Sequence, residues 1–198
     1  MTYAYVIDLK KCVGCHSCAV SCKAANGTPP SVTRAHVIRS YEGSYPNVSR
    51  MIRPVMCNQC DNPICVDVCP EEGATYKREE DGIVVIDKEI CIGCFKCVDV
   101  CPYGSRYKIQ SPDGYFGSEL TPYELQAKQY SDVDMIDKCD FCLEYNGGEA
   151  PDPVCVMACP VEARHFGDLA DLQGLISSRN GEVYMDEEGT SPNVYYLP

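Results

Sequence analysis

The sequence predicts an α+β fold made of two small units, one of them inserted into the other. Three observations support this prediction. The chain of 198 residues contains 16 cysteines, which fall into four groups of four. The distances along the chain pair the second group with the third and leave the first to pair with the fourth. Only four Phe and no Trp are available for an apolar core, and two small units of this composition need staples or metals to be stable.

The charge and hydropathy of the chain exclude several classes of protein. Lys and Arg total 17 and Asp and Glu total 29, a net charge of −12, the opposite of a nucleic-acid-binding protein. Apolar runs such as residues 83–86 are far too short for a membrane span. The N-terminus has no basic region, apolar stretch or twin arginine, so we expect no export signal of its own. A disulfide framework is then disfavoured, since disulfides persist in oxidising compartments.

The cysteine spacing indicates the kind of site. The first and third groups have the spacing C-x2-C-x2-C-x3-C, which is typical of bacterial ferredoxins. The second and fourth keep the same ends with a longer middle spacer, and no cysteine is left over. The four groups are Cys12, Cys15, Cys18 and Cys22; Cys57, Cys60, Cys65 and Cys69; Cys91, Cys94, Cys97 and Cys101; and Cys139, Cys142, Cys155 and Cys159.

This spacing favours [4Fe–4S] clusters over the alternatives. A compact loop with a cysteine at every third position directs three thiolates at one cubane, and the fourth cysteine serves the neighbouring cluster of a pair. Disulfides do not require four such quartets. Zinc ribbons need two CxxC pairs per metal, and three histidines are too few for mixed sites. We therefore expect four [4Fe–4S] clusters and no catalytic residue, because four thiolates leave no iron open to substrate.

Chain distances predict how the groups pair. The second and third groups are separated by 21 residues, whereas 34 separate the first from the second and 37 the third from the fourth. We expect one ferredoxin-like unit from residues 1–50 plus 130–198, with sites one and two, and an inserted one from residues 51–129, with sites three and four. The ligands are Cys12, Cys15, Cys18 and Cys159 at site one; Cys139, Cys142, Cys155 and Cys22 at site two; Cys57, Cys60, Cys65 and Cys101 at site three; and Cys91, Cys94, Cys97 and Cys69 at site four.

The predicted helices and strands alternate with the cluster loops. Strand periodicity, breakers and turn residues define them. We expect strands at 3–9, in 37–55 on both sides of a turn, at 83–87 and at 193–197, and helices at 18–25, 64–69, 95–101 and 169–178. Residues 111–134 are rich in turn-forming residues and predict a long surface connection with a helical turn at 123–129, and residues 146–151 predict a loop.

The residues around the cysteines resemble the four-cluster iron–sulfur (electron-transfer, beta) subunit of dimethyl-sulfoxide-reductase-family molybdopterin oxidoreductases. The resemblance covers nearly the whole chain. It rests on Tyr5-Val-Ile-Asp before Cys12-x-Gly-Cys15, on Cys57-Asn-Gln-Cys60-Asp-Asn-Pro-Ile-Cys65, on Cys91-Ile-Gly-Cys94 and Cys101-Pro-Tyr-Gly, and on Lys138-Cys139-Asp-Phe-Cys142 with Ala163-Arg164-x-Phe166-Gly-Asp-Leu169.

The resemblance implies a subunit that carries electrons through its clusters to or from a large catalytic subunit. That partner would hold the molybdenum or tungsten bis-pterin cofactor, with site one nearest to it and sites two, three and four leading away. In many relatives a quinone-reactive membrane subunit meets site four. The chain would be cytoplasmic, or exported together with a signal-bearing catalytic subunit. Nitrate-reductase-like relatives replace one cysteine of the third group with Trp; this chain keeps all of them, so we expect four cubanes.

Two other functions remain open from the sequence: a free polyferredoxin or hydrogenase-type electron wire, and a cysteine-rich zinc-binding interaction module. Co-purification with a molybdenum subunit, and brown absorption, would discriminate against them. Several residues beside the cysteines could influence a cluster, for example by tuning its reduction potential, but a purely structural or surface role is at least as good an interpretation. We expect a solvated loop for His16, surface charge for Lys96, Arg106 and Lys108, and plain packing for Tyr103 and Tyr107.

Overall fold

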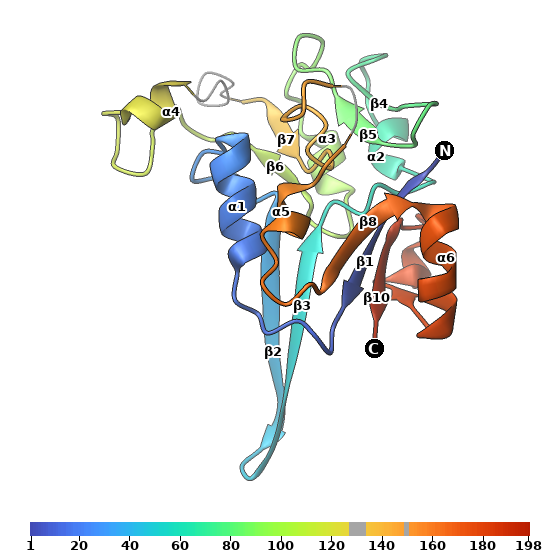
Figure 1. Ribbon diagram of the computed structural model, residues 1–198. Helices are drawn as coiled ribbons and strands as arrows, with labels where there is room; N and C mark the ends of the chain where they lie inside the picture. The colour runs from blue at the N-terminus through green and yellow to red at the C-terminus, as the bar shows by residue number, and fades with distance from the viewer. Residues whose placement is uncertain (127–133, 149–150) are drawn as a thin grey trace.

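The computed structural model describes residues 1–126, 134–148 and 151–198, and its elements are short and mixed (Figure 1). The helices are α1 (Ser17–Asn26), α2 (Ile64–Asp67), α3 (Lys96–Asp99), α4 (Pro122–Gln126), α5 (Val154–Met157) and α6 (Leu169–Ser178), with a 3-10 turn, η2 (Asp186–Glu188). The strands are β1 (Tyr3–Asp8), β2 (Ala35–Ser44), β3 (Asn47–Met56), β4 (Thr75–Lys77), β5 (Val84–Ile86), β6 (Arg106–Lys108), β7 (Ile136–Lys138), β8 (Arg164–Asp168), β9 (Glu182–Val183) and β10 (Val194–Leu197).

A four-stranded sheet joins the two ends of the chain in the order β8-β1-β10-β9. β1 runs parallel to β10 and antiparallel to β8, so that Tyr5 lies opposite both Val194 and Phe166. Side chains alternate across a strand. Val6 therefore packs with α6 on one face, while Tyr5 and Ile7 pack with cysteines on the other. Figure 1 shows β1 beside β10, with α6 alongside the sheet. The sheet thus presents one face to the cysteines.

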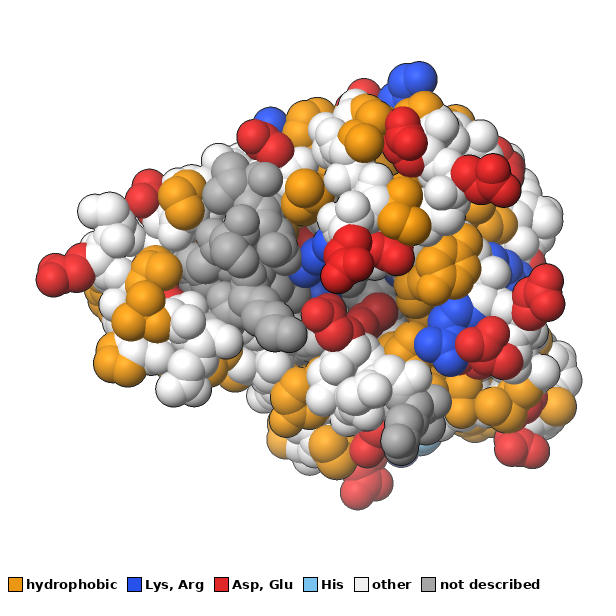
Figure 2. All heavy atoms as spheres, turned by 90° about the horizontal axis from the view of Figure 1, so that it is seen from above, with side chains coloured by type: hydrophobic (Ala, Val, Ile, Leu, Met, Phe, Trp, Pro, Cys, Tyr) orange, Lys and Arg blue, Asp and Glu red, His pale blue; other side chains and the backbone are white. Residues whose placement is uncertain are grey.

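Three separate two-stranded antiparallel sheets accompany it: the hairpins β2–β3 and β4–β5, and the pair β6–β7. β2–β3 is paired from Ala35 opposite Met56 to Ser44 opposite Asn47, and it projects away from the body of the molecule (Figure 1). In the part of the chain described, no helix is both long and apolar enough to cross a membrane. Acidic side chains are spread over the face shown in Figure 2 and do not gather in one patch.

Cysteines and aromatic rings share the main core. Cys18, Cys22, Cys139 and Cys155 belong to the same buried group as Tyr5 and Phe141. Two of the four Phe meet there, since the rings of Phe141 and Phe166 lie edge to face with centroids 5.1 Å apart. This core therefore combines cysteines with aromatic rings, mostly Tyr, in a sequence that has few Phe and no Trp.

The main elements of the prediction are confirmed, and the differences are the ends of two helices, the unpredicted helix α5 and five short strands. β1, α1, the β2–β3 hairpin, β5, α6 and β10 lie where they were expected. α2 and α3 end two residues before Cys69 and Cys101, whereas the prediction extended both helices through these cysteines. A proline follows each cysteine, and a residue before proline is disfavoured in the helical conformation. The short strands β4, β6, β7, β8 and β9 were not predicted.

Three predictions meet the limits of the described residues or leave a boundary open. α4 covers part of the expected helical turn at 123–129, and residues 127–129 lie outside the described part. Residues 149 and 150 of the expected 146–151 loop also lie outside it. β6, from the predicted inserted unit, pairs with β7, from the other unit. This pairing crosses the expected boundary at 129/130, and the division into two units stays a prediction.

Candidate iron–sulfur sites

Two of the four expected ligand sets line cavities in the structure. One cavity, with about 340 Å³ of empty space, is lined by Cys12, Cys15, Cys18 and Cys159 among other residues. A second, with about 350 Å³, is lined by Cys69, Cys91, Cys94 and Cys97. In both cavities the last cysteine of one group lies with the first three of its partner group. The four-thiolate donor set is the one that a [4Fe–4S] cubane takes, so sites one and four fit this cofactor.

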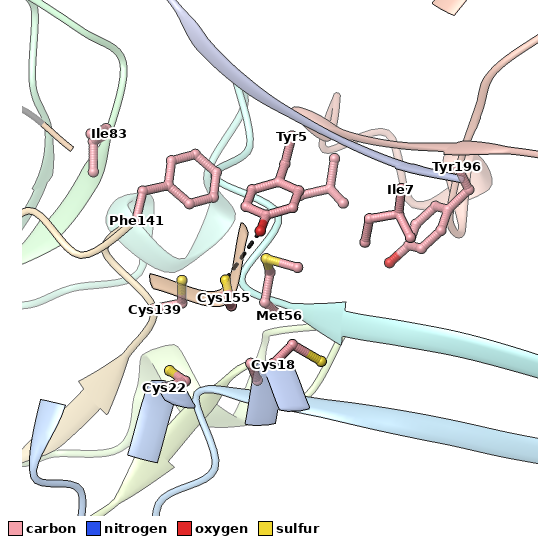
Figure 3. Close-up of a cluster of buried hydrophobic side chains, with 12 residues drawn as sticks. Tyr5, Ile7, Cys18, Cys22, Met56, Ile83, Cys139, Phe141, Cys155 and Tyr196 are labelled. Atoms are coloured by element: carbon pink, nitrogen blue, oxygen red, sulfur yellow. Dashed lines mark hydrogen bonds between the residues drawn. The ribbon is translucent and has the colours of Figure 1, made fainter. Parts of the chain in front are cut away.

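The cysteines assigned to site two lie deepest in the molecule. Figure 3 shows Cys22, Cys139 and Cys155 on one side of the view, while the Cys18 sulfur points away from them. The Asn26 amide nitrogen is 3.6 Å from the Cys22 sulfur and 3.9 Å from the Cys142 sulfur. One side chain of α1 thus approaches sulfurs from the first and fourth groups. All four cysteines of the set are buried: Cys22, Cys139, Cys142 and Cys155.

The cysteines assigned to site three influence one another. Burial raises the pKa of the Cys60 thiol to about 12, and nearby Cys57, Cys65 and Cys101 add to the rise. Burial likewise raises the pKa of Cys22 to about 12. A metal site requires thiolates rather than thiols. Iron bound between these buried sulfurs would supply the positive charge that stabilises their thiolate form.

All sixteen cysteines are free of disulfides in the structure. Within residues 1–126, 134–148 and 151–198, no three His, Cys, Asp or Glu side chains converge closely enough to hold a single metal ion. The sulfurs of sites one and four instead surround open space. A cubane spreads its four irons over the corners of a cube and binds one thiolate at each.

The cysteines of the four predicted sites differ in exposure. Cys15 and Cys94 are the exposed ones among the sixteen. Each stands in a Cys-x-Gly-Cys loop, two residues after an exposed apolar side chain, Val13 or Ile92. Sites one and four therefore come closest to the surface, and the cysteines of sites two and three are buried or half-buried.

A larger cavity, with about 1150 Å³ of empty space, carries no cysteine. Its lining includes charged side chains of both signs, among them Arg34, Arg78, Asp137 and Glu144. Arg34 and Asp137 form a buried pair with a contact of 2.6 Å. We assign this cavity no cluster, since it offers no thiolate.

The structure corrects one expectation about the residues beside the clusters. Arg106 is not surface charge: it is 3% exposed. Its guanidinium lies 3.0 Å from the Cys65 sulfur and 2.9 Å from the Thr75 hydroxyl. Its position at the start of β6, which was not predicted, turns it inward. Arg164 is equally buried and lines the site one cavity, a feature the sequence reasoning missed.

The other flanking residues were mostly interpreted correctly. Lys96 is exposed and Lys108 forms a partly exposed ion pair of 2.9 Å with Asp134. Tyr103 bonds to Thr190 at 2.6 Å and packs beside an aromatic ring. His16 is half-buried and lines the site one cavity, so it is less solvated than expected. A shared pattern could have found the two buried arginines, because each follows the last cysteine of its group by five residues, in Cys-Pro-x-x-x-Arg.

Several subunits of known reductases align with nearly the whole of this chain. Residues 48–113 match the family described as a 4Fe-4S dicluster domain. One subunit of the selenate reductase of Mesobacillus selenatarsenatis is 41% identical over 208 residues, covering 97% of this chain and 70% of that protein. One subunit of the tetrathionate reductase of Salmonella typhimurium is 39% identical over 98% of this chain and 72% of its own length. The arsenate respiratory reductase iron-sulfur subunit of Shewanella sp. is 34% identical over 100% of this chain and 96% of its own length.

Proposed function

Because this chain belongs to the iron–sulfur subunits of dimethyl-sulfoxide-reductase-family molybdopterin oxidoreductases, we propose that it binds four [4Fe–4S] clusters in the four ligand sets given above. It is an electron-transfer subunit of an oxidoreductase complex and has no catalytic role of its own. Each thiolate-bound cubane passes single electrons. The observation that carries the ligand assignment is the presence of Cys159 and Cys69 in the cavities of their partner groups.

The proposed electron path runs through sites one, two, three and four in that order. Exposure supports the two ends, since Cys15 of site one and Cys94 of site four reach the surface. Sequence supports the order, because one unit, 1–50 plus 130–198, would hold sites one and two and the inserted unit, 51–129, sites three and four. An electron that enters at one exposed end can then leave at the other.

We propose that the molybdenum or tungsten bis-pterin catalytic subunit docks at the site one end. The β2–β3 hairpin borders that site, with Val37 and Pro54 lining its cavity and the Arg39 guanidinium donating to the Gly14 carbonyl. The hairpin continues outward to Tyr45, which is 93% exposed. A two-stranded ribbon is marginal by itself in water, so a catalytic partner that covers it would stabilise it. A second redox partner would meet site four.

Selective cysteine substitution tests the ligand assignment. Cys69→Ala and Cys94→Ala should abolish the same component of the electron paramagnetic resonance spectrum of the reduced complex, because both would ligate site four. Cys101→Ala should instead abolish the component lost in Cys65→Ala, which reports site three. Loss of the Cys65 component in Cys69→Ala would reject the exchange of ligands between groups.

Metal analysis of the anaerobic complex tests the cofactor itself. About 16 irons per chain, together with broad brown absorption, are expected from four cubanes. Zinc without visible absorption would indicate the zinc-binding interaction module instead. A chain that is stable alone and does not co-purify with a molybdenum subunit would indicate a free polyferredoxin.

A further inference from the structure

Two buried arginines occupy equivalent places in the chain. Arg106 and Arg164 each follow the last cysteine of a group by five residues, and each is the first residue of a strand, β6 or β8. They are 3% and 4% exposed. A guanidinium stays charged at this depth, and a buried charge is costly unless another charge or a set of hydrogen bonds compensates it.

Protein carboxylates do not supply that compensation. Among the described residues, no Asp or Glu oxygen lies within 4.0 Å of either guanidinium. One terminal nitrogen of each, Nη1 of Arg106 and Nη2 of Arg164, is buried without a hydrogen-bond partner. Both side chains line the cluster cavities, Arg106 that of site four and Arg164 that of site one. The negative charge that is missing would therefore come from the clusters.

Each arginine also reaches the neighbouring cluster of its pair. Arg106 Nη2 is 3.0 Å from the sulfur of Cys65, which belongs to site three. Arg164 Nη1 lies 3.2 Å from the Tyr5 hydroxyl, which is 3.0 Å from the sulfur of Cys155, a site two ligand. Figure 3 shows the Tyr5 hydroxyl pointing at Cys155. One guanidinium thus lies between sites three and four, and the other between sites one and two.

We propose that each arginine raises the reduction potentials of the two clusters beside it: Arg106 those of sites three and four, and Arg164 those of sites one and two. This inference rests on the proposed function. A cubane with a 2+ core and four thiolates carries about two negative charges, and a one-electron reduction adds a third. A nearby cation stabilises the reduced form more than the oxidised form, and it does so strongly where the effective dielectric constant is low. The same cation lessens the repulsion that one reduced cluster exerts on the other.

The two arginines differ in how they contact the second cluster of the pair. Arg106 touches a ligand sulfur of site three directly, so removal of its charge should affect sites three and four together. Arg164 reaches site two through the Tyr5 hydroxyl. Hydrogen bonds to ligand sulfurs raise cluster potentials. Tyr5→Phe should therefore lower the potential of site two while the charge beside site one stays in place.

Redox titration of the anaerobic complex, followed by electron paramagnetic resonance, tests the proposal. Arg106→Gln should make reduction of sites three and four at least tenfold less favourable, which is about 59 mV for a one-electron couple, with smaller changes at sites one and two. Arg164→Gln should give the converse pattern. Arg106→Lys keeps the charge and should restore most of the potential. Arg179→Gln removes an equal charge at the end of α6, where the side chain is 35% exposed and pairs with Asp8, and should change the four potentials far less.

The outcomes separate this inference from the proposed function. Fewer than four clusters in the unsubstituted complex would contradict the proposed function. Four clusters there, with potentials that do not move in Arg106→Gln and Arg164→Gln, would overturn the inference alone. Equal shifts in Arg106→Gln and Arg106→Lys would also overturn it, because geometry and not charge would then be responsible. If Arg106→Gln loses iron, Arg106→Lys decides: it must keep four clusters with potentials near those of the parent.

Discussion

Replacement of Asp137 with alanine should destabilise the protein more than any change to a surface ion pair. Asp137 accepts two hydrogen bonds from Arg34, at 2.7 Å from Nε and 2.6 Å from Nη2, and both side chains are 3% exposed. Removing one partner of a buried pair leaves an uncompensated charge and costs about 3–5 kcal/mol. Asp140, 3.2 Å from Arg34, compensates part of it, so we expect the lower end of that range.

The effect should extend to site two. Arg34 Nη1 donates to the side-chain carbonyl oxygen of Asn26 at 2.9 Å, and the amide nitrogen of Asn26 faces the sulfurs of Cys22 and Cys142. In Asp137→Ala the released guanidinium no longer holds Asn26 in place. We therefore expect the site two cluster to be the first one lost when the variant is warmed.

Thermal unfolding of the cluster-loaded chain measures this. A loss of 1 kcal/mol lowers the midpoint by about 2–4 °C in a chain of this size, so Asp137→Ala, at about 3 kcal/mol, should unfold roughly 6–12 °C lower. Lys77→Met is the matched control: its pair with Asp61 is also 2.6 Å long, but the two side chains are 29% and 45% exposed. An exposed pair contributes about 0–1 kcal/mol, a shift of at most about 4 °C. Equal shifts in the two variants would refute the reasoning.

Two further substitutions address single local features. Gly93→Ala, at φ +64°, places a Cβ 2.3 Å from the Asp134 carbonyl oxygen, and the variant should lose the site four cluster, which a measurement of iron content would show. In Gly104→Ala, at φ +57°, the new Cβ meets nothing within 4 Å. That control should show only the conformational cost of about 1–2 kcal/mol. Retention of that cluster in Gly93→Ala would show that the loop adapts. Asp168→Ala removes the side chain that accepts the Ala170 N–H at the start of α6 and should cost about 1 kcal/mol, a midpoint decrease of about 2–4 °C; no decrease would mean that water replaces the cap.

The sequence predicted those elements whose signals are local. The α6 range is the predicted one because its periodicity is complete and Asp168 caps it with a 2.9 Å bond to the Ala170 N–H. α1 ends where Asn26-Gly27 indicated, with Gly27 in the left-handed conformation at φ 56°. The cysteine quartets were recognisable because a cubane requires thiolates at fixed spacing.

Three of the missed strands, β6, β7 and β8, depend on partners far along the chain. β8 forms because residues Arg164–Asp168 pair with β1, some 160 residues earlier, with Tyr5 opposite Phe166. β6 and β7 have three residues each and pair across the cluster region. Such short runs carry almost no periodicity. The inward turn of Arg106 follows from that pairing, which explains why its charge was assigned to the surface.

Other long-range contacts join the second cysteine group to the fourth group and to the C-terminal end of the chain. Gln59, between two cysteines of the second group, is 1% exposed. Its amide nitrogen donates to the Cys139 carbonyl at 2.7 Å, and its backbone carbonyl accepts from Asn193 at 2.8 Å. Its side-chain oxygen accepts from the Val84 N–H at 2.8 Å. The Gln59 side chain thereby joins the predicted inserted unit to the backbone of Cys139, an assigned site two ligand, and the Gln59 backbone is joined to the C-terminal end of the chain. On the proposed electron path, the rate of transfer from site two to site three depends on this separation. A buried, hydrogen-bonded amide holds it more firmly than apolar packing, because each displaced hydrogen bond would leave an unpaired buried polar group.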